Sequence, residues 1–222
     1  MKYQLVVFDM DGTILNTMDD LVATTNYALR VCGMPQKTRQ EVQACVGYGL
    51  EVLLNKAVPE GTSKEEHQKM IDAYHAYYRE HYADFTRPYE GIVQTIRRLR
   101  EAGVKTAVVS NKSDYGVQLL ARKYFCGLFD TARGMKEGMN CKPAPDAVLD
   151  VLRTLNVPAE HAVYVGDSDV DIFTANNAGM DCLSVTWGFR SESSLRQAGA
   201  RHILHETHEI ADFVLMENQK EQ

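Results

Sequence analysis

Short apolar runs alternate with longer amphipathic segments along most of this 222-residue chain. Four of the runs are rich in β-branched residues, and they are short for buried helices. They therefore predict strands that are covered on both faces of a parallel sheet. The runs are YQLVVF at residues 3–8, KTAVVS at 105–110, HAVYVG at 161–166 and DCLSVT at 181–186.

Helical patterns lie between these runs. Residues 91–103 place three apolar side chains at helical spacing and end at Gly103, while residues 145–155 begin with Pro145, which suits the first turn of a helix. An alternation of strands and helices is typical of a doubly wound sheet. We therefore expect an α/β core with a Rossmann-like parallel sheet.

Residues 17–85 break this alternation, because they contain helical patterns and no convincing strand. TRPYEG at 86–91 has the proline and glycine of a return linker. The sequence therefore predicts an α/β core of residues 1–16 and 86–222, interrupted by an all-helical, four-helix domain at 17–85. The expected helices are 18–32, 38–46, 49–58 and 63–84.

Composition and charge exclude several classes of function. The net charge of −6 and the lack of a long basic run argue against a nucleic-acid partner. The five cysteines form no C-x-x-C pair, so they are expected to be reduced thiols in a cytoplasmic protein. The opening MKYQLVVFDM is too short and too polar for a signal peptide or a membrane span, and no membrane partner is expected.

Polar residues gather where the predicted strands end. Ligands of doubly wound sheets bind beyond the carboxyl ends of the strands, so we expect these side chains to lie together at one edge. Lys142 joins them because it stands just before the helix at 145–155. The strand-end residues are Asp9, Asp11, Ser110, Asn111, Asp167 and Asp171.

This set of side chains suits phosphoryl transfer. Carboxylates packed together raise one another's pKa unless a cation neutralises them, and hard oxygen ligands favour Mg²⁺. One carboxylate can attack phosphorus while a second acid protonates the leaving oxygen, and Asp9 and Asp11 can supply this pair. Ser110 and Lys142 can meet the charge on the transferring group, and Asp167 can complete the metal shell.

Four segments carry a resemblance to a known family. DMDGTIL, VVSNK, KPAPD and GDSDVDI resemble, in order, the four motifs of the haloacid dehalogenase superfamily of phosphatases, and they span nearly the whole chain. The helical insertion is similar to the four-helix cap of that family, and VGYGLEVLLNKA within it is similar to the cap of phosphoglycolate phosphatases. Dehalogenases proper lack the second aspartate, so Asp11 argues against carbon–halogen cleavage. Asn16 departs from the family pattern, in which an acidic residue is more usual.

The resemblance implies a role for each matching residue. Asp9 would be the nucleophile and Asp11 the general acid and then the base. Ser110 would bind the phosphate together with the neighbouring Asn111. Lys142 would hold the nucleophile and the phosphate together.

The resemblance also implies a metal site. Asp9, the main-chain carbonyl of Asp11 and Asp167 would bind Mg²⁺. Asp171 would be a partner of Lys142 or of a metal-bound water. Asp169 is given no role, because its position varies in the family pattern.

The expected function is Mg²⁺-dependent hydrolysis of a small phosphorylated metabolite through an aspartyl phosphate, with the cap closing over the substrate. Phosphoglycolate is the favoured substrate. The alternatives are a pyrophosphatase, a sugar-phosphate phosphatase, a phosphomutase of the β-phosphoglucomutase kind and a catalytically silent regulatory or binding protein on the same fold. The oligomeric state stays open.

Two other patterns could indicate binding sites. Gly47 and Gly49 lack a third glycine in register, so we expect a turn of the helical domain and no dinucleotide site. His202, His205 and His208 straddle a predicted strand and helix, so they need not share a face and a metal role is disfavoured.

An aromatic series occurs at helical spacing in residues 63–84. Packing inside the helical domain is the better interpretation than a base-stacking surface, because basic charge is missing. The series is Tyr74, Tyr77, Tyr78 and Tyr82, and Met70 precedes it at the same spacing.

Overall fold

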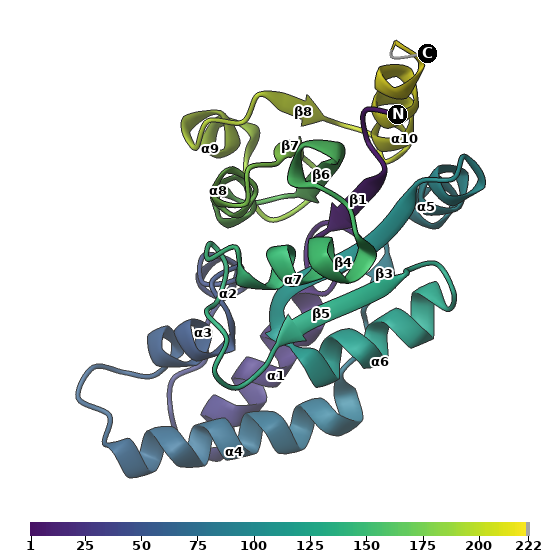
Figure 1. Ribbon diagram of the computed structural model, residues 1–222. Coiled ribbons are helices and arrows are strands. Elements are labelled where there is room, and N and C mark those ends of the chain that lie inside the picture. The colour runs from purple at the N-terminus through teal and green to yellow at the C-terminus, as the bar shows by residue number, and fades with distance from the viewer. Residues whose placement is uncertain (221–222) are drawn as a thin grey trace. The chain divides into compact units, whose positions relative to one another are not determined.

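The structure is a computed structural model that describes residues 1–220, and it divides the chain into two compact units (Figure 1). One unit consists of Met1–Leu15 and Pro88–Gln222, and the other is Asn16–Arg87. The roles expected for these parts, a catalytic core and a cap, stay predictions.

The first unit is built on a parallel sheet of six strands, which confirms the predicted Rossmann-like α/β fold. The strand order is β5-β4-β1-β6-β7-β8, so the first strand of the chain lies in the middle. The strands are β1 (Leu5–Phe8), β4 (Lys105–Ser113), β5 (Thr131–Met135), β6 (Ala162–Gly166), β7 (Asp181–Val185) and β8 (His202–Leu204).

Helices cover both faces of this sheet. Leu5 and Val7 of β1 belong to a core cluster with buried residues of α7 and α8, while Phe8 contacts the ring of Phe129 on the other side of the strand. Central strands are fully buried as a result. The helices of this unit are α5 (Ile92–Glu101), α6 (Asp114–Phe125), α7 (Asp146–Leu155), the 3-10 helix Ala159–His161, α8 (Asp169–Asn177), α9 (Glu192–Gln197) and α10 (His208–Gln219).

The two ends of the described chain lie side by side in this unit (Figure 1). The Asn218 side chain of α10 accepts a hydrogen bond from the Tyr3 main-chain N–H at 2.6 Å and donates one to the Tyr3 carbonyl at 2.9 Å. This reciprocal pair of hydrogen bonds attaches the segment before β1 to α10.

The edges of the sheet differ most from the prediction. β5 carries Arg133 and Gly134, and only one of its five residues is buried, so it lacks the apolar run that identifies a central strand. The helix predicted at 145–155 begins one residue later, at Asp146, because Pro145 occupies the N-cap position. That detail of the prediction was wrong.

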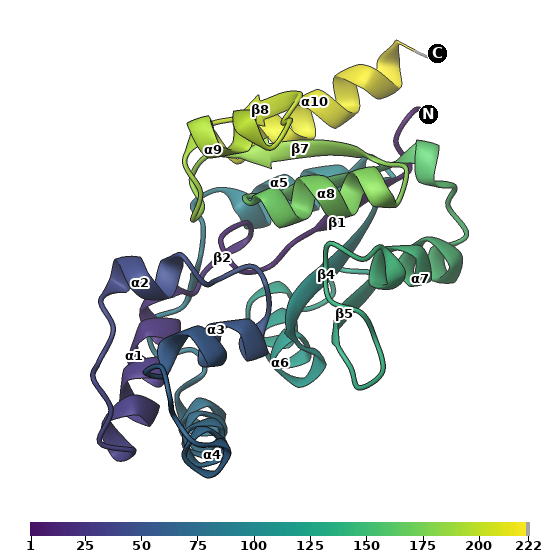
Figure 2. The ribbon, with the colours of Figure 1, turned by 90° about the vertical axis from the view of Figure 1, so that its left-hand side faces the viewer.

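The second unit is helical, as predicted for residues 17–85. Its helices are α1 (Met18–Val31), α2 (Arg39–Gln43), α3 (Leu50–Ala57) and α4 (Lys64–His81). Helices α1 and α4 pack against one another (Figure 2). Met70, Tyr74 and Tyr78 of α4 are buried in their shared core, which confirms the predicted packing role of these three residues. Tyr77 is half-buried and stacks on Tyr27 with ring centroids 4.1 Å apart.

A buried carboxylate fixes the return segment of the helical unit. Asp20 of α1 is 3% exposed. It accepts hydrogen bonds from the main-chain N–H groups of Phe85 and Thr86 and from the Thr86 hydroxyl. The short strands β2 (Leu15–Asn16) and β3 (Arg87–Pro88) pair where the chain passes between the units.

The glycine and histidine patterns have ordinary places in the fold. Gly47 and Gly49 have φ angles of 106° and 95° and form the turn before α3, as predicted. His202 lies on β8 and His208 starts α10, so the histidines do straddle a strand and a helix. Among residues 1–220, no helix combines the length and apolar character that crossing a bilayer requires.

Candidate active site

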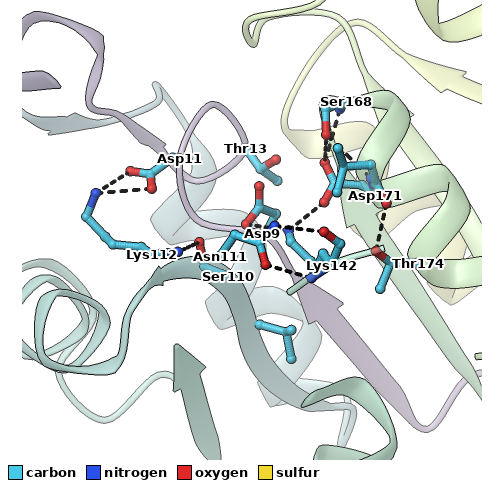
Figure 3. A network of polar contacts seen from close by, with 12 residues as sticks. Asp9, Asp11, Thr13, Ser110, Asn111, Lys112, Lys142, Ser168, Asp171 and Thr174 are labelled. Carbon is cyan, nitrogen blue, oxygen red and sulfur yellow. Dashed lines mark hydrogen bonds and ion pairs between the residues drawn. The ribbon is translucent and has the colours of Figure 1, made fainter. Parts of the chain in front are cut away.

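The site residues predicted from the sequence lie at the carboxyl edge of the sheet, near the ends of three neighbouring strands. Phe8, the last residue of β1, pairs with Val108 of β4 and Val165 of β6. Asp9 directly follows β1 and Asp167 directly follows β6, while Ser110 lies within β4, two residues after Val108. Figure 3 shows Asp9 and Ser110 together with Asn111, Lys142 and Asp171. Asp167 belongs to the same group as Asp9 and Asp171.

Three buried carboxylates form the centre of the site. One oxygen each of Asp9, Asp167 and Asp171 lies within 4.8 Å of the others, and the residues are 5%, 1% and 0% exposed. Lys142 is the ammonium that contacts the cluster. Within residues 1–220, Asp167 has no ion-pair partner, so three carboxylates face one ammonium and two negative charges stay uncompensated.

The Lys142 ammonium lies between two of these carboxylates. Its Nζ is 2.9 Å from Asp9 Oδ1 as an ion pair, and it donates hydrogen bonds to Asp171 Oδ1 at 2.7 Å and to the Tyr164 hydroxyl at 3.1 Å. Burial lowers the pKa of Lys142, but attraction to Asp171 and Asp9 outweighs burial and holds the pKa well above its usual value. The ammonium is therefore charged throughout the physiological range of pH.

Main-chain contacts fix the position of Lys142. The Asn111 side chain accepts a hydrogen bond from the Lys142 N–H at 2.7 Å and donates one to the Lys142 carbonyl at 3.0 Å. The Tyr164 hydroxyl donates to the Val109 carbonyl at 2.9 Å. A role of Asn111 in substrate binding stays a prediction from the sequence. In the structure its side-chain amide contacts the main chain of Lys142.

Asp171 is held by the start of α8. It forms a capping box with Ser168, whose N–H and hydroxyl both donate to Asp171 Oδ2, at 3.1 and 2.6 Å. The other oxygen, Oδ1, is thereby left to Lys142. Asp169, to which no role is assigned, pairs with Arg190 at 3.3 Å.

Asp167 is enclosed by two loops. Its Oδ1 accepts a hydrogen bond from the Thr13 hydroxyl at 3.0 Å, and its Oδ2 accepts one from the Phe189 N–H at 2.7 Å. A Cβ at Gly12 or Gly188 would overlap with the Asp167 side chain, so both positions need glycine. The Trp187 indole donates to the Thr13 carbonyl at 3.0 Å and joins the two loops.

Asp11 has a different partner. Both of its oxygens lie 3.1 Å from Lys112 Nζ, and the two side chains are only 13% and 8% exposed. Figure 3 shows the Asp11 carboxylate turned towards Lys112, away from the group that Asp9 forms with Lys142 and Asp171.

The cluster has the properties of a divalent-metal site. Burial, then the neighbouring charges of Asp171 and Asp11, raise the pKa of Asp9 to about 7. Burial and the charges of Asp171 and Asp9 raise the pKa of Asp167 to about 8. A divalent cation would balance the two uncompensated charges, and an all-oxygen donor set suits a hard cation. These residues therefore fit a metal ion.

We expect the metal-free protein to lose stability as pH rises. The folded pKa values of Asp9 and Asp167 lie above the ordinary value of 3.8, so the folded state binds more protons than the unfolded state between about pH 4 and pH 8. The free energy of unfolding measured in chelator should fall across this window, and Mg²⁺ should restore it most at the upper end. Asp167→Asn should make the free energy of unfolding depend less steeply on pH. A free energy that rises with pH across this window would contradict the prediction.

Several groups at the site were not identified from the sequence. Thr13 belongs to a quoted motif, but nothing in the pattern shows that its hydroxyl meets a carboxylate 154 positions later. Lys112 directly follows Ser110 and Asn111, and this adjacency was the available signal. Tyr164 looks like an ordinary core residue of β6. The Phe189 N–H carries no side-chain signal at all.

Comparisons with known proteins agree with this geometry. A family model described as haloacid dehalogenase-like hydrolase matches residues 6–185. Phosphoglycolate phosphatase 1 of Pseudomonas aeruginosa is 32% identical over 195 residues, covering 84% of this chain and 70% of that protein. Pyrophosphatase PpaX of Halalkalibacterium halodurans is 26% identical over 218 residues, covering 96% and 98%.

A solved structure is similar over almost the whole chain. It is the crystal structure of a Lactobacillus delbrueckii protein provisionally assigned as a phosphoglycolate phosphatase. The TM-score is 0.90 at 36% identity, and the match covers 96% of this chain and 99% of that one. The similarity therefore includes both units of the chain.

Proposed function

This chain belongs to the haloacid dehalogenase-like hydrolase family and is a phosphatase, and from this premise we propose that it hydrolyses a small phosphate monoester through a phosphoryl-aspartate at Asp9. The match over residues 6–185 confirms the resemblance that the four motifs indicate. The observation that carries the proposal is the buried group of Asp9, Asp167 and Asp171 beside Lys142, with Asp11 held close by.

The proposed reaction has two halves. An oxygen of Asp9 attacks phosphorus, the bond from phosphorus to the leaving oxygen breaks, and Asp11 gives that oxygen a proton. Asp11 then takes a proton from water, which attacks the phosphoryl group and breaks its bond to Asp9. Phosphate leaves, and both aspartates return to their starting state.

Donors around Asp9 would stabilise the transferring group. The Ser110 hydroxyl would bind a phosphoryl oxygen, and the Lys142 ammonium would hold Asp9 and the phosphate together. Asp9, Asp167 and the main-chain carbonyl of Asp11 would hold Mg²⁺, with Asp171 behind them as the partner of Lys142. When bound, the cation supplies positive charge for the phosphoryl oxygens.

Phosphoglycolate is the proposed substrate. The support is the named relatives, together with the similarity of VGYGLEVLLNKA to the cap of phosphoglycolate phosphatases. Pyrophosphate is the second candidate, because the pyrophosphatase relative matches over 96% of this chain and 98% of its own length. The part of the helical unit in substrate selection and the cytoplasmic location stay predictions from the sequence.

Phosphate release across a panel of substrates tests this proposal. The panel contains phosphoglycolate, pyrophosphate, sugar phosphates and nucleotides, each with Mg²⁺ and with a chelator. We expect the highest kcat/KM with phosphoglycolate and at least about a hundredfold loss without the cation, because the buried carboxylates then repel the substrate phosphate. A clear preference for pyrophosphate would replace the substrate assignment and leave the mechanism intact.

Two further outcomes would point to the other classes. Isomerisation of a sugar phosphate in a coupled assay, without net phosphate release, would indicate a mutase. No turnover of any substrate with Mg²⁺ would indicate a binding or regulatory protein and would overturn the proposed function.

A further inference from the structure

We propose that Lys112 is a positioning residue for the acid and base Asp11, an inference that rests on the proposed function. Its ammonium contacts both Asp11 oxygens at 3.1 Å, in a pair that is nearly closed to solvent. Within residues 1–220, no other member of the proposed machinery forms a hydrogen bond or an ion pair with the Asp11 carboxylate. Lys112 is therefore the group that determines where this carboxylate points.

The direction that Lys112 imposes suits in-line displacement. The leaving oxygen departs on the side of phosphorus opposite the attacking Asp9 oxygen. An acid that serves this oxygen must stand apart from Asp9, with room for a phosphoryl group between them. Asp11 turns away from Asp9 towards Lys112, whereas Asp171 and Lys142 lie on the Asp9 side (Figure 3).

An irregularity of β4 places Lys112 at the site. Between Val109 and Ser113 the strand advances four residues while β5 advances two, from Arg133 to Met135. Such a bulge changes the direction of the side chains that it contains, and here it contains Ser110, Asn111 and Lys112. The Lys112 N–H also donates to the Ser110 hydroxyl at 3.4 Å.

Gly134 on β5 allows the bulge to form. A Cβ at this residue would lie 2.7 Å from the Lys112 carbonyl and 2.6 Å from the Asp114 nitrogen, so only glycine fits beside the bulge. The location of Lys112 is therefore built into the main chain of two strands. This arrangement is typical of a residue that holds a catalytic group, because a mobile surface lysine would need no such support.

Lys112→Met should remove this positioning and leave the rest of the site intact. We expect kcat/KM for phosphoglycolate, whose alkoxide needs a proton, to fall about 10- to 100-fold. We expect kcat/KM for p-nitrophenyl phosphate to stay within about threefold, because its aryl oxide leaves without a proton. Lys112→Arg should recover most of the activity. Lys136→Met is the matched control, because Lys136 pairs with Asp114 at 3.6 Å and lies outside the site.

A double-mutant comparison separates positioning from substrate binding. If Lys112 acts through Asp11, then adding Lys112→Met to the Asp11→Asn variant should lower kcat/KM by less than about twofold. The comparison is made with p-nitrophenyl phosphate and with phosphoglycolate. The proposal would be overturned if the two substitutions lowered kcat/KM by independent factors. It would also be overturned if Lys112→Met raised KM for phosphoglycolate alone and left kcat unchanged; Lys112 would then be a ligand of the substrate carboxylate. An equal loss with both substrates in the single variant would also overturn it.

The wild-type protein distinguishes this inference from the proposed function. Turnover by wild type together with an unaffected Lys112→Met variant would overturn the role of Lys112 alone. Lack of turnover by wild type on every substrate would overturn the proposed function first.

Discussion

Asp9→Asn removes phosphate release almost completely: we expect turnover of phosphoglycolate to fall at least about 10⁴-fold. An amide is a poor nucleophile towards phosphorus. Among residues 1–220, the other carboxylate in contact with Lys142 is Asp171, and its two oxygens are already bonded to Ser168 and to Lys142, so it is not expected to replace Asp9 as the attacking group. Phosphate release measured over hours, with Mg²⁺ in excess, checks the expected loss.

The same substitution should not unfold the protein. It reduces the buried carboxylates around the Lys142 ammonium from three to two and leaves that ammonium paired with Asp171, so the metal-free variant should be at least as stable as wild type at neutral pH. Stability and activity therefore move in opposite directions. Asp169→Asn is the matched control, since Asp169 begins α8 between Asp167 and Asp171 but pairs with Arg190. Residual activity above about 1% of wild type in Asp9→Asn would contradict the nucleophile assignment.

Lys142→Met is expected to affect both the fold and the reaction. It leaves Asp9 and Asp171 without the ammonium that contacts them, and both carboxylates are buried. Removing one partner of a buried ion pair costs about 3–5 kcal/mol of unfolding free energy. We also expect turnover to fall at least about 10³-fold, because the phosphate and the nucleophile lose their shared cation. Denaturant unfolding and phosphate release measure the two effects.

A second substitution tests the cause of the instability. Lys142→Met combined with Asp171→Asn should regain part of the lost free energy without regaining activity, because one unpaired charge is removed. Lys105→Met provides the control, since Lys105 lies on β4 outside the site and its ammonium donates a hydrogen bond to the Leu155 carbonyl at 2.7 Å. A Lys142→Met variant as stable as this control would show that the ammonium contributes nothing to the fold.

The central part of the fold could be predicted because burial dictates its residue pattern. The strands β1, β4, β6 and β7 are apolar runs of the kind that a doubly covered sheet requires. β5 has Arg133 and Gly134 at its centre because it lies at an edge and accommodates the bulge of β4. That constraint comes from a neighbouring strand, and a local pattern does not contain it.

The contacts of the site were likewise predictable only in part. Asp9 and Asp167 could be placed together from sequence because each directly follows a central strand. The contact between Asn111 and Lys142 could not, since it depends on the path of the loop between β5 and α7. The Lys112–Asp11 pair depends on the β4 bulge. Contacts that follow from regular strands were predictable, and contacts made by irregular main chain were not.

The chain has a single tryptophan, and its position makes it a natural optical probe. The indole of Trp187 is bonded to the Thr13 carbonyl, and Thr13 and Phe189 hold the two oxygens of Asp167. Indole emission from the native protein therefore originates two hydrogen bonds away from the carboxylate cluster, with Thr13 between them. Cation titrations can thus be followed by intrinsic fluorescence without a label or an engineered reporter.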